Sequence, residues 1–193
     1  YLAVVLIAAC NLAATVITTR KSFRSNWIKD VKELSYISLV RPQLEYATAA
    51  WDPYTSCNIK DIEMVQRRAA RYVKRDYQRT TSVTSLLDSL HWQSLQDRRR
   101  NARLLHFFKA LHGYQGLSQL VNDLPRPTRL TRSSCVDVVA FSQLPCRTDV
   151  FKFSFLPRTV IDWNSLDTGV RGLSSLESFR QALVGGRSAA TSY

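Results

Sequence analysis

Hydrophobic residues recur at helical spacing through the first two thirds of the chain. Between residues 28 and 51 one predicted face carries Val31, Leu34, Ile37 and Leu44, with Tyr36, Leu39 and Val40 at its edges. A second stripe lies between residues 56 and 75, and its members are Ile59, Ile62, Val65, Ala69, Tyr72 and Val73. The pattern predicts two amphipathic helices, of which Ser56 or Asn58 caps the second.

Proline interrupts the first predicted helix in the stretch SLVRPQLEYATAAWDPYT. Pro42 has no N–H to donate, so it either bends the helix or splits it after Val40. The helix then ends near Trp51, because the step from Asp52 to Pro53 favours a turn. We expect a packed corner here, made of Trp51, Pro53 and Tyr54, with Trp51 in the core.

The arginine before this proline has two interpretations. Arg41 is either an exposed phosphate contact or the ion-pair partner of Glu45, four residues further along the same helix. The ion pair is the interpretation that we favour.

Further elements follow along the chain. Helices are predicted at 82–90, at 95–111, where His112 and Gly113 close the helix, and at 174–184. The β-rich runs VDVVAF (136–141) and VFKFSF (150–155) predict two short strands. The expected fold class is therefore mainly α, with a smaller mixed α/β part at the C-terminal end.

Charge is the outlier of the composition. The chain has 27 Lys and Arg residues and 15 Asp and Glu residues, which gives a net charge of +12. A solvated surface does not need such an excess, so the charge favours a polyanionic partner. The nucleic-acid-binding residues that we predict fall in two patches, of which the first is Arg67, Arg68, Arg71, Lys74 and Arg75 and the second Arg98, Arg99, Arg100 and Arg103. Arginine clusters of this kind contact phosphate without reading sequence. The alternatives are an anionic membrane surface and plain solvated faces, on which arginines cover apolar surface or pair with acids on neighbouring helices.

No catalytic motif stands out. The sequence contains no GxSxG, Walker, GxGxxG or HExxH pattern and no adjacent pair of aspartates. The four cysteines lack the short spacings of a zinc site. Cys135 and Cys146 are close enough in sequence for a disulfide, but we interpret all four cysteines as reduced and mostly packing. We predict no metal or cofactor in this chain.

Residues 1–18 are almost entirely apolar and precede the basic residues Arg20, Lys21 and Arg24. A buried core segment and a signal-anchor both have this composition. The chain does not begin with Met, and we interpret it as a fragment.

Six segments, in order, resemble the C-terminal third of non-LTR retrotransposon (LINE, jockey-like) reverse transcriptases. They are VKELSYISLVRPQLEYATAAWDPYT, IKDIEMVQRRAARYV, SLLDSLHWQSLQDRRRNARLLHFFKALHG, LTRSS, FKFSFLPRTVIDWNSL and SLESFRQAL. The resemblance covers about residues 28–183. It implies a basic, helical, thumb-like domain at 28–122 and a mixed C-terminal region at 123–193, after a divergent apolar segment at 1–27.

The resemblance also implies a function. In this family such a region follows the polymerase palm, and its thumb grips the RNA/DNA template–primer duplex. We therefore expect a non-catalytic fragment of an RNA-directed DNA polymerase in a nuclear or cytoplasmic setting. The catalytic palm, with the Mg²⁺ that the family uses, would lie in the missing upstream part, and a membrane partner is not expected. The alternative is a helical interaction protein that binds acidic protein partners. In one form of this alternative, residues 1–18 anchor the protein to a membrane.

Overall fold

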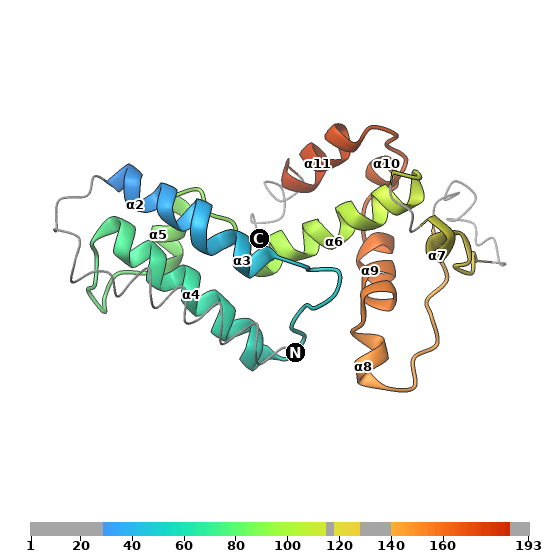
Figure 1. Ribbon diagram of the computed structural model, residues 1–193, viewed down its shortest axis with the longest axis horizontal. Helices are drawn as coiled ribbons and strands as arrows, with labels where there is room; N and C mark the ends of the chain where they lie inside the picture. Colours follow the sequence, from blue (N-terminus) through green and yellow to red (C-terminus); the bar gives the residue numbers. More distant parts are fainter. Residues whose placement is uncertain (1–28, 115–117, 128–139, 186–193) are drawn as a thin grey trace. The chain divides into compact units, whose positions relative to one another are not determined.

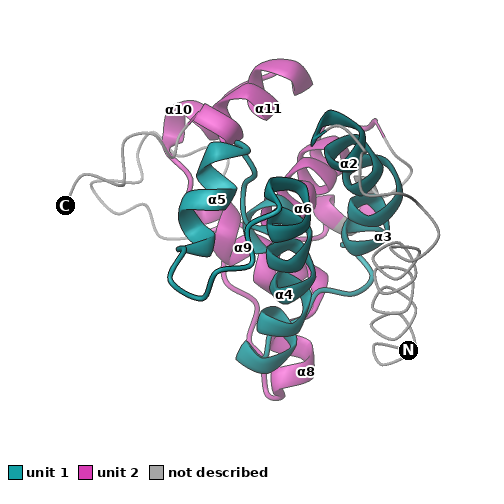
Figure 2. Ribbon diagram, turned by 90° about the vertical axis from the view of Figure 1, so that its left-hand side faces the viewer, with its two compact units in different colours: residues 1–99 teal, residues 100–193 magenta. Residues whose placement is uncertain are grey.

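The structure is a computed structural model that describes residues 29–114, 118–127 and 140–185 (Figure 1). The described residues form helices and no strands, which confirms the mainly α fold class. They divide into two compact units, and the border falls inside one helix, between Arg99 and Arg100 (Figure 2). The border expected from the sequence lay later, at residue 122.

The N-terminal helical region of unit 1 consists of three consecutive pieces. They are α2 (Lys29–Ser35), the π-helical turn η2 (Tyr36–Val40) and α3 (Arg41–Glu45). The π turn is the structural response to Pro42: the Arg41 N–H bonds the carbonyl of Tyr36, five residues back. Such a wide turn displaces the carbonyl that an α-helix would direct against the proline ring. The predicted split after Val40 does not occur, since the backbone of both Val40 and Arg41 is helical, and the helix accommodates Pro42 through the widened turn.

The π turn also changes which side chains reach the core. Buried positions follow at intervals of four, at Lys32, Tyr36, Val40 and Leu44. The predicted stripe is wrong at three positions that are exposed instead, namely Val31, Leu34 and Leu39. Uniform helical spacing cannot anticipate a change of phase inside the helix. Lys32 is tolerated in the core because its stem packs there while its ammonium lies 4.9 Å from the centre of the Tyr72 ring.

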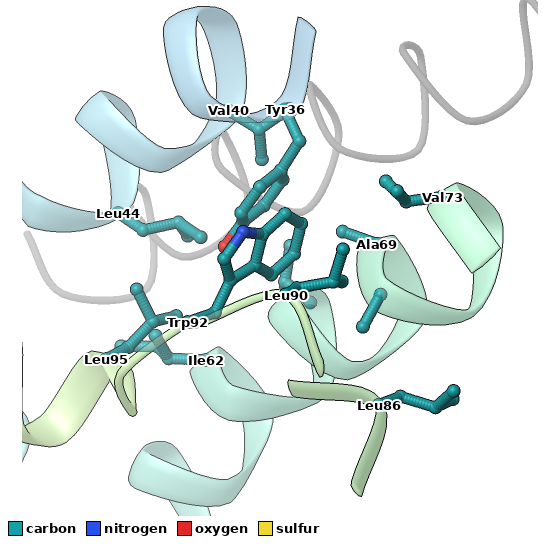
Figure 3. Packing of buried hydrophobic residues seen from close by; sticks show 12 residues of the cluster. Tyr36, Val40, Leu44, Ile62, Ala69, Val73, Leu86, Leu90, Trp92 and Leu95 are labelled. Carbon is teal, nitrogen blue, oxygen red and sulfur yellow. The ribbon is translucent and has the colours of Figure 1, made fainter. Parts of the chain in front are cut away.

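The core of unit 1 lies between these pieces, α4 (Ser56–Lys74) and α5 (Val83–Ser89). Figure 3 shows the side chains of this core around Tyr36 and Trp92, whose rings stack with centroids 4.5 Å apart. The indole N–H of Trp92 donates to Glu33 Oε1 at 3.0 Å, so the only polar atom of this ring is satisfied. α4 begins at Ser56, because Thr55 is its N-cap. The predicted caps, Ser56 and Asn58, therefore lie inside the helix.

α3 ends at Glu45, six residues before the helix end predicted near Trp51. The turn that follows includes Ala47 with a φ of +49°, a left-handed conformation that stops an α-helix. Pro53 is buried and Trp51 half-buried against the core, whereas Tyr54 is 41% exposed, so the predicted corner forms only in part.

α6 (Leu95–Leu111) has the predicted bounds, and Gly113 follows it with a φ of +72°. Its second half belongs to unit 2, together with α7 (Ser118–Asn122), α8 (Asp149–Lys152), α9 (Phe155–Asn164), α10 (Thr168–Arg171) and α11 (Leu176–Gly185). The core of this unit is aromatic and contains Phe107, Phe108, Trp163 and Phe179, all fully buried. The last predicted helix, 174–184, corresponds to α11.

The strand predicted at 150–155 is wrong, because α8 and the start of α9 occupy these residues. Thr148 caps α8 by accepting a bond from the N–H of Phe151, and Ser154 is the N-cap of α9. The Thr148 cap favours a helix over the strand that the β propensity of the following aromatic residues predicts, whereas Ser154 makes no side-chain capping bond. The other predicted strand, 136–141, lies mainly outside the described residues.

An asparagine fixes the segment before α8. Asn164 donates from Nδ2 to the carbonyl of Phe141 at 2.7 Å and accepts the N–H of Phe141 at 3.2 Å. Together with the buried Trp163, it ties the end of α9 to the extended residues around 141. Trp163 and Asn164 are the WN pair of one of the six segments that carry the family resemblance.

Cys57 and Cys146 are free, in agreement with the prediction for these two residues. Cys57 is exposed, so it is not the packing residue that we expected. Cys10, Cys135 and the apolar residues 1–18 lie outside the described residues.

Candidate nucleic-acid interface

One side of α4 carries six cations, with the exposed Met64 between the first of them and the rest. We call it the α4 basic face and define it by its six residues, Lys60, Arg67, Arg68, Arg71, Lys74 and Arg75. Arg71 and Lys74 are half-buried and the other four are exposed. From Lys60 to Lys74 the face extends about 21 Å along the helix, at about 1.5 Å per residue.

The packing of α4 explains why this face points outward. The opposite side of the helix buries Ile62, Val65, Ala69 and Val73 in the core of unit 1. Residues two positions away from such a stripe lie on the other side of the helix. The position of the basic face thus follows directly from the apolar pattern, as the sequence predicted.

Little within the described part of the chain neutralises this face. There, the side chains of Lys60, Arg67, Arg68 and Lys74 make neither a hydrogen bond nor an ion pair. Glu63 is engaged elsewhere and accepts the N–H of Gln96 at 2.9 Å. Closely spaced cations without carboxylate partners create a positive potential that attracts anions.

Arg71 also binds the loop after α4 through hydrogen bonds. Its Nη1 donates to the carbonyl of Gln78 at 2.7 Å and its Nη2 to that of Thr81 at 3.4 Å. Both acceptors are neutral, and the carboxylate nearest to Arg71 in this loop is that of Asp76, which interacts with its charge without a direct ion pair. Sequence analysis did not foresee this contact, and it also left Lys60 out of the predicted set, although Lys60 lies seven residues before Arg67 on the same side of α4.

The loop carries an acid that is itself held in place. Asp76 Oδ1 accepts the N–H of Gln78 at 3.0 Å. This bond, a second from the Thr81 side chain and the nearby charge of Arg71 keep the pKa of Asp76 below its ordinary value. Asp76 is therefore ionised and already committed to ordering the loop.

The second predicted patch, on α6, has a different structure. Arg98 pairs with Glu45: Nη2 lies 2.9 Å from Oε2, and Nε also donates to Oε1. The hydrogen bonds with Glu45 raise the pKa of Arg98 above its ordinary value. Although about a third of the side chain of Arg98 is exposed, its guanidinium already has a carboxylate.

The prediction that Arg99 contacts phosphate is wrong. Its side chain is 2% exposed, and Nε donates to Asp52 Oδ1 at 2.7 Å. The remaining nitrogens donate to the carbonyls of Trp51, at 2.6 Å, and Leu44. The guanidinium also lies 3.9 Å from the centre of the Trp51 ring. Arg99 is thus an internal clamp on the residues around the WDP turn.

The prediction is also wrong for Arg103, which is 3% exposed in unit 2. Arg103 Nη2 lies 2.6 Å from Asp162 Oδ2, and burial, followed by the nearby Arg158, lowers its pKa. Arg100 binds the same carboxylate at 3.1 Å and donates to Ser165 Oγ at 2.9 Å. Arg100 keeps some exposure, but its guanidinium is paired as well.

Arg41 has the ion pair that we favoured for it. Its Nε lies 3.8 Å from Glu45 Oε1, four residues along the chain. Burial, followed by the charge of Arg98, lowers the pKa of Arg41. Glu45 thus joins two arginines, and the prediction of a structural ion pair is confirmed.

The described residues contain neither a metal-ligand cluster nor a membrane-spanning helix. Within residues 29–114, 118–127 and 140–185, no three His, Cys, Asp or Glu side chains come together as a metal site would require. None of the helices in these ranges has the length and apolar character needed to cross a membrane.

Comparison of the chain with known protein families, with curated proteins and with solved structures finds no match.

Proposed function

We propose that this chain binds a nucleic-acid duplex through the α4 basic face, as a non-catalytic, thumb-like part of an RNA-directed DNA polymerase. The observation that carries the proposal is the row of cations on α4, of which Lys60, Arg67, Arg68 and Lys74 have no partner among the described side chains. Phosphates at regular spacing along a duplex are a matching partner for a straight row of about 21 Å. The polymerase context comes from the six motif segments, and the palm and its Mg²⁺ would belong to the parent polypeptide.

The interface that we propose is smaller than the one predicted from the sequence. Four of the nine predicted residues, Arg98, Arg99, Arg100 and Arg103, are paired with carboxylates, and breaking such pairs to reach phosphate is unfavourable. Lys60 joins the remaining five. The proposed interface thus has six cations instead of nine.

Salt titration tests this number. Because each neutralised phosphate releases counterions, six contacts give a slope of log K against log salt of about −5, and nine give about −8. Raising salt from about 50 to 200 mM should thus weaken duplex binding on the order of 10³-fold for six contacts. Fluorescence anisotropy of a labelled duplex measures the slope. A slope near zero would refute phosphate binding, and one near −8 would show that the α6 arginines leave their ion pairs.

A variant and its matched control locate the interface. Lys60→Gln, Arg67→Gln and Lys74→Gln together remove three charges that make no hydrogen bond or ion pair with the described residues, so folding should be little affected. The slope should shrink by about 3. The control replaces three exposed cations that belong to other segments than α4, Lys29, Arg147 and Lys152, by Gln. It removes the same net charge and should leave the slope nearly unchanged. Equal effects of the two triple variants would show that only net charge matters.

Two experiments address the alternatives. An acidic protein partner lacks the condensed counterions of a duplex, so binding to it would have a shallow salt slope. The parent gene tests the polymerase context, because an upstream reading frame should encode a palm with paired aspartates. A complete upstream sequence without such a palm would overturn this part of the proposal and leave duplex binding to be judged separately.

A further inference from the structure

The loop that follows α4, residues 75–82, is ordered by contacts with the helix that it leaves. Arg71 holds the carbonyls of Gln78 and Thr81, and Asp76 accepts the N–H of Gln78. The N–H of Asp76 also bonds the carbonyl of Arg71 at 3.1 Å. Because Arg71 lies in the last turn of α4, the loop is fixed at the C-terminal end of the α4 basic face.

This loop presents an aromatic ring between two cations. Tyr77 is 52% exposed, and Arg75 and Arg79 on either side of it are exposed as well. By contrast, the α4 basic face itself has no aromatic residue among its six members. An exposed aromatic ring flanked by cations is the arrangement with which proteins bind unpaired bases, because the ring stacks on the base and the cations contact its phosphates.

The two surfaces differ in the form of nucleic acid that they suit. A cationic row contacts backbone phosphates, which a duplex offers regardless of sequence. A stacking ring needs the face of a base, and inside a duplex neighbouring base pairs cover these faces. An unpaired base next to the end of the duplex is free to stack.

We propose that the preferred ligand is a duplex that continues into a single strand, and that Tyr77 stacks on the first unpaired bases. This inference rests on the proposed function, since it assumes that the duplex lies on the α4 basic face. It adds a preference for the junction between paired and unpaired strands. The loop contributes to it because its hydrogen bonds hold Tyr77 in place before binding, which reduces the entropy lost on ordering.

The experiment compares two labelled ligands with the full chain. One is a blunt duplex of roughly 12 base pairs, about twice what a 21 Å face spans at about 3.4 Å per pair. The other is the same duplex with an overhang of about four nucleotides, made in both strand polarities. A 2-aminopurine at the first unpaired position reports stacking through the quenching of its fluorescence. The overhang of one polarity should increase affinity about tenfold, with quenching on binding.

Three variants assign this gain. Tyr77→Ala should reduce the gain to less than about twofold and remove the quenching, and Tyr77→Phe should keep both because the ring remains. Tyr114→Ala removes a tyrosine of similar exposure (60%) in unit 2 and should leave the gain intact. Thermal denaturation checks that each variant is folded.

The outcomes separate the two proposals. Steep salt dependence with equal affinity for the two ligands, or a gain that survives Tyr77→Ala, overturns the junction preference and leaves duplex binding standing. Failure to bind either ligand at low salt overturns duplex binding and the junction preference with it.

Discussion

Removal of the Arg99 side chain should strongly destabilise unit 1. The guanidinium is almost fully buried and bonds Asp52 together with the carbonyls of Leu44 and Trp51. Breaking a buried ion pair by deleting one partner costs about 3–5 kcal/mol, because the other charge stays buried. Each buried carbonyl that loses its donor adds about 1 kcal/mol or more. We therefore expect Arg99→Met to lower the free energy of unfolding by about 4 kcal/mol or more, against a total of about 5–15 kcal/mol for an ordinary domain.

Urea denaturation measures this loss. With a slope of about 2 kcal/mol per molar urea, a loss of 4 kcal/mol moves the midpoint down by about 2 M. Circular dichroism follows helix content, and tryptophan fluorescence follows the four tryptophans together, among them Trp51, whose ring lies beside the guanidinium. The matched control is Arg67→Met on the α4 basic face, for which a change within about 0.5 kcal/mol is expected because Arg67 is exposed.

A second variant tests the stated cause. If the isolated Asp52 carboxylate accounts for most of the loss, then Arg99→Met combined with Asp52→Leu should recover about 2 kcal/mol or more. A midpoint for Arg99→Met equal to that of Arg67→Met would refute the reasoning. It would show that Arg99 is not buried, and the α6 patch would again be available for phosphate.

Three further predictions follow from single residues. Arg75 and His91 both have positive φ (56° and 54°), so Arg75→Gly and His91→Gly should each stabilise folding by about 1 kcal/mol in urea denaturation. Only Arg75→Gly should also make the salt slope of duplex binding less steep, by about 0.9. Equal binding by these two variants would contradict the role of Arg75. Burial raises the pKa of Tyr36, so the contribution of its neutral phenol to stability is fully present below the unfolded pKa of about 10 and falls as pH rises above that value. Tyr36→Phe should remove this alkaline loss of stability, which denaturation midpoints at about pH 9 and 11 measure. A loss unchanged in Tyr36→Phe would contradict the assignment. Asn164→Ala removes both bonds to the Phe141 backbone and should cost about 2 kcal/mol, and a cost near zero would mean that this tie does not stabilise unit 2.

The parts of the fold that local patterns determine were predictable from the sequence. α5 and α6 lie at or within one residue of their predicted bounds, because capping residues and apolar stripes are local signals. The π turn at Tyr36–Val40 was not predictable, since nothing before Pro42 distinguishes a widened turn from a simple kink. The strand predicted at 150–155 failed for a related reason: β propensity describes a fit to a sheet, and no sheet exists among the described residues to receive that segment.

The candidate site also has a part that local patterns determine and a part that distant residues determine. The α4 basic face was predictable because its outward direction depends only on the apolar stripe of the same helix. The fate of the α6 arginines depends on Glu45, Asp52 and Asp162, which lie 53, 47 and 62 residues away from Arg98, Arg99 and Arg100. Three consecutive helical residues also point in different directions, so a run of arginines is not one surface.

Net charge has to be weighed by location before it indicates a partner. The +12 of this chain includes arginines that stabilise the units from within, and these say nothing about a ligand. A buried arginine with a carboxylate and two carbonyls loses those partners if it turns toward a phosphate, so its contribution to binding is small or negative. Lys60, Arg67, Arg68 and Lys74 have no such partners to lose among the described residues, and each phosphate contact that they make is a net gain. The same residue type therefore stabilises the fold on α6 and is free to bind on α4, and the difference lies in the carboxylates that distant segments bring to α6 alone.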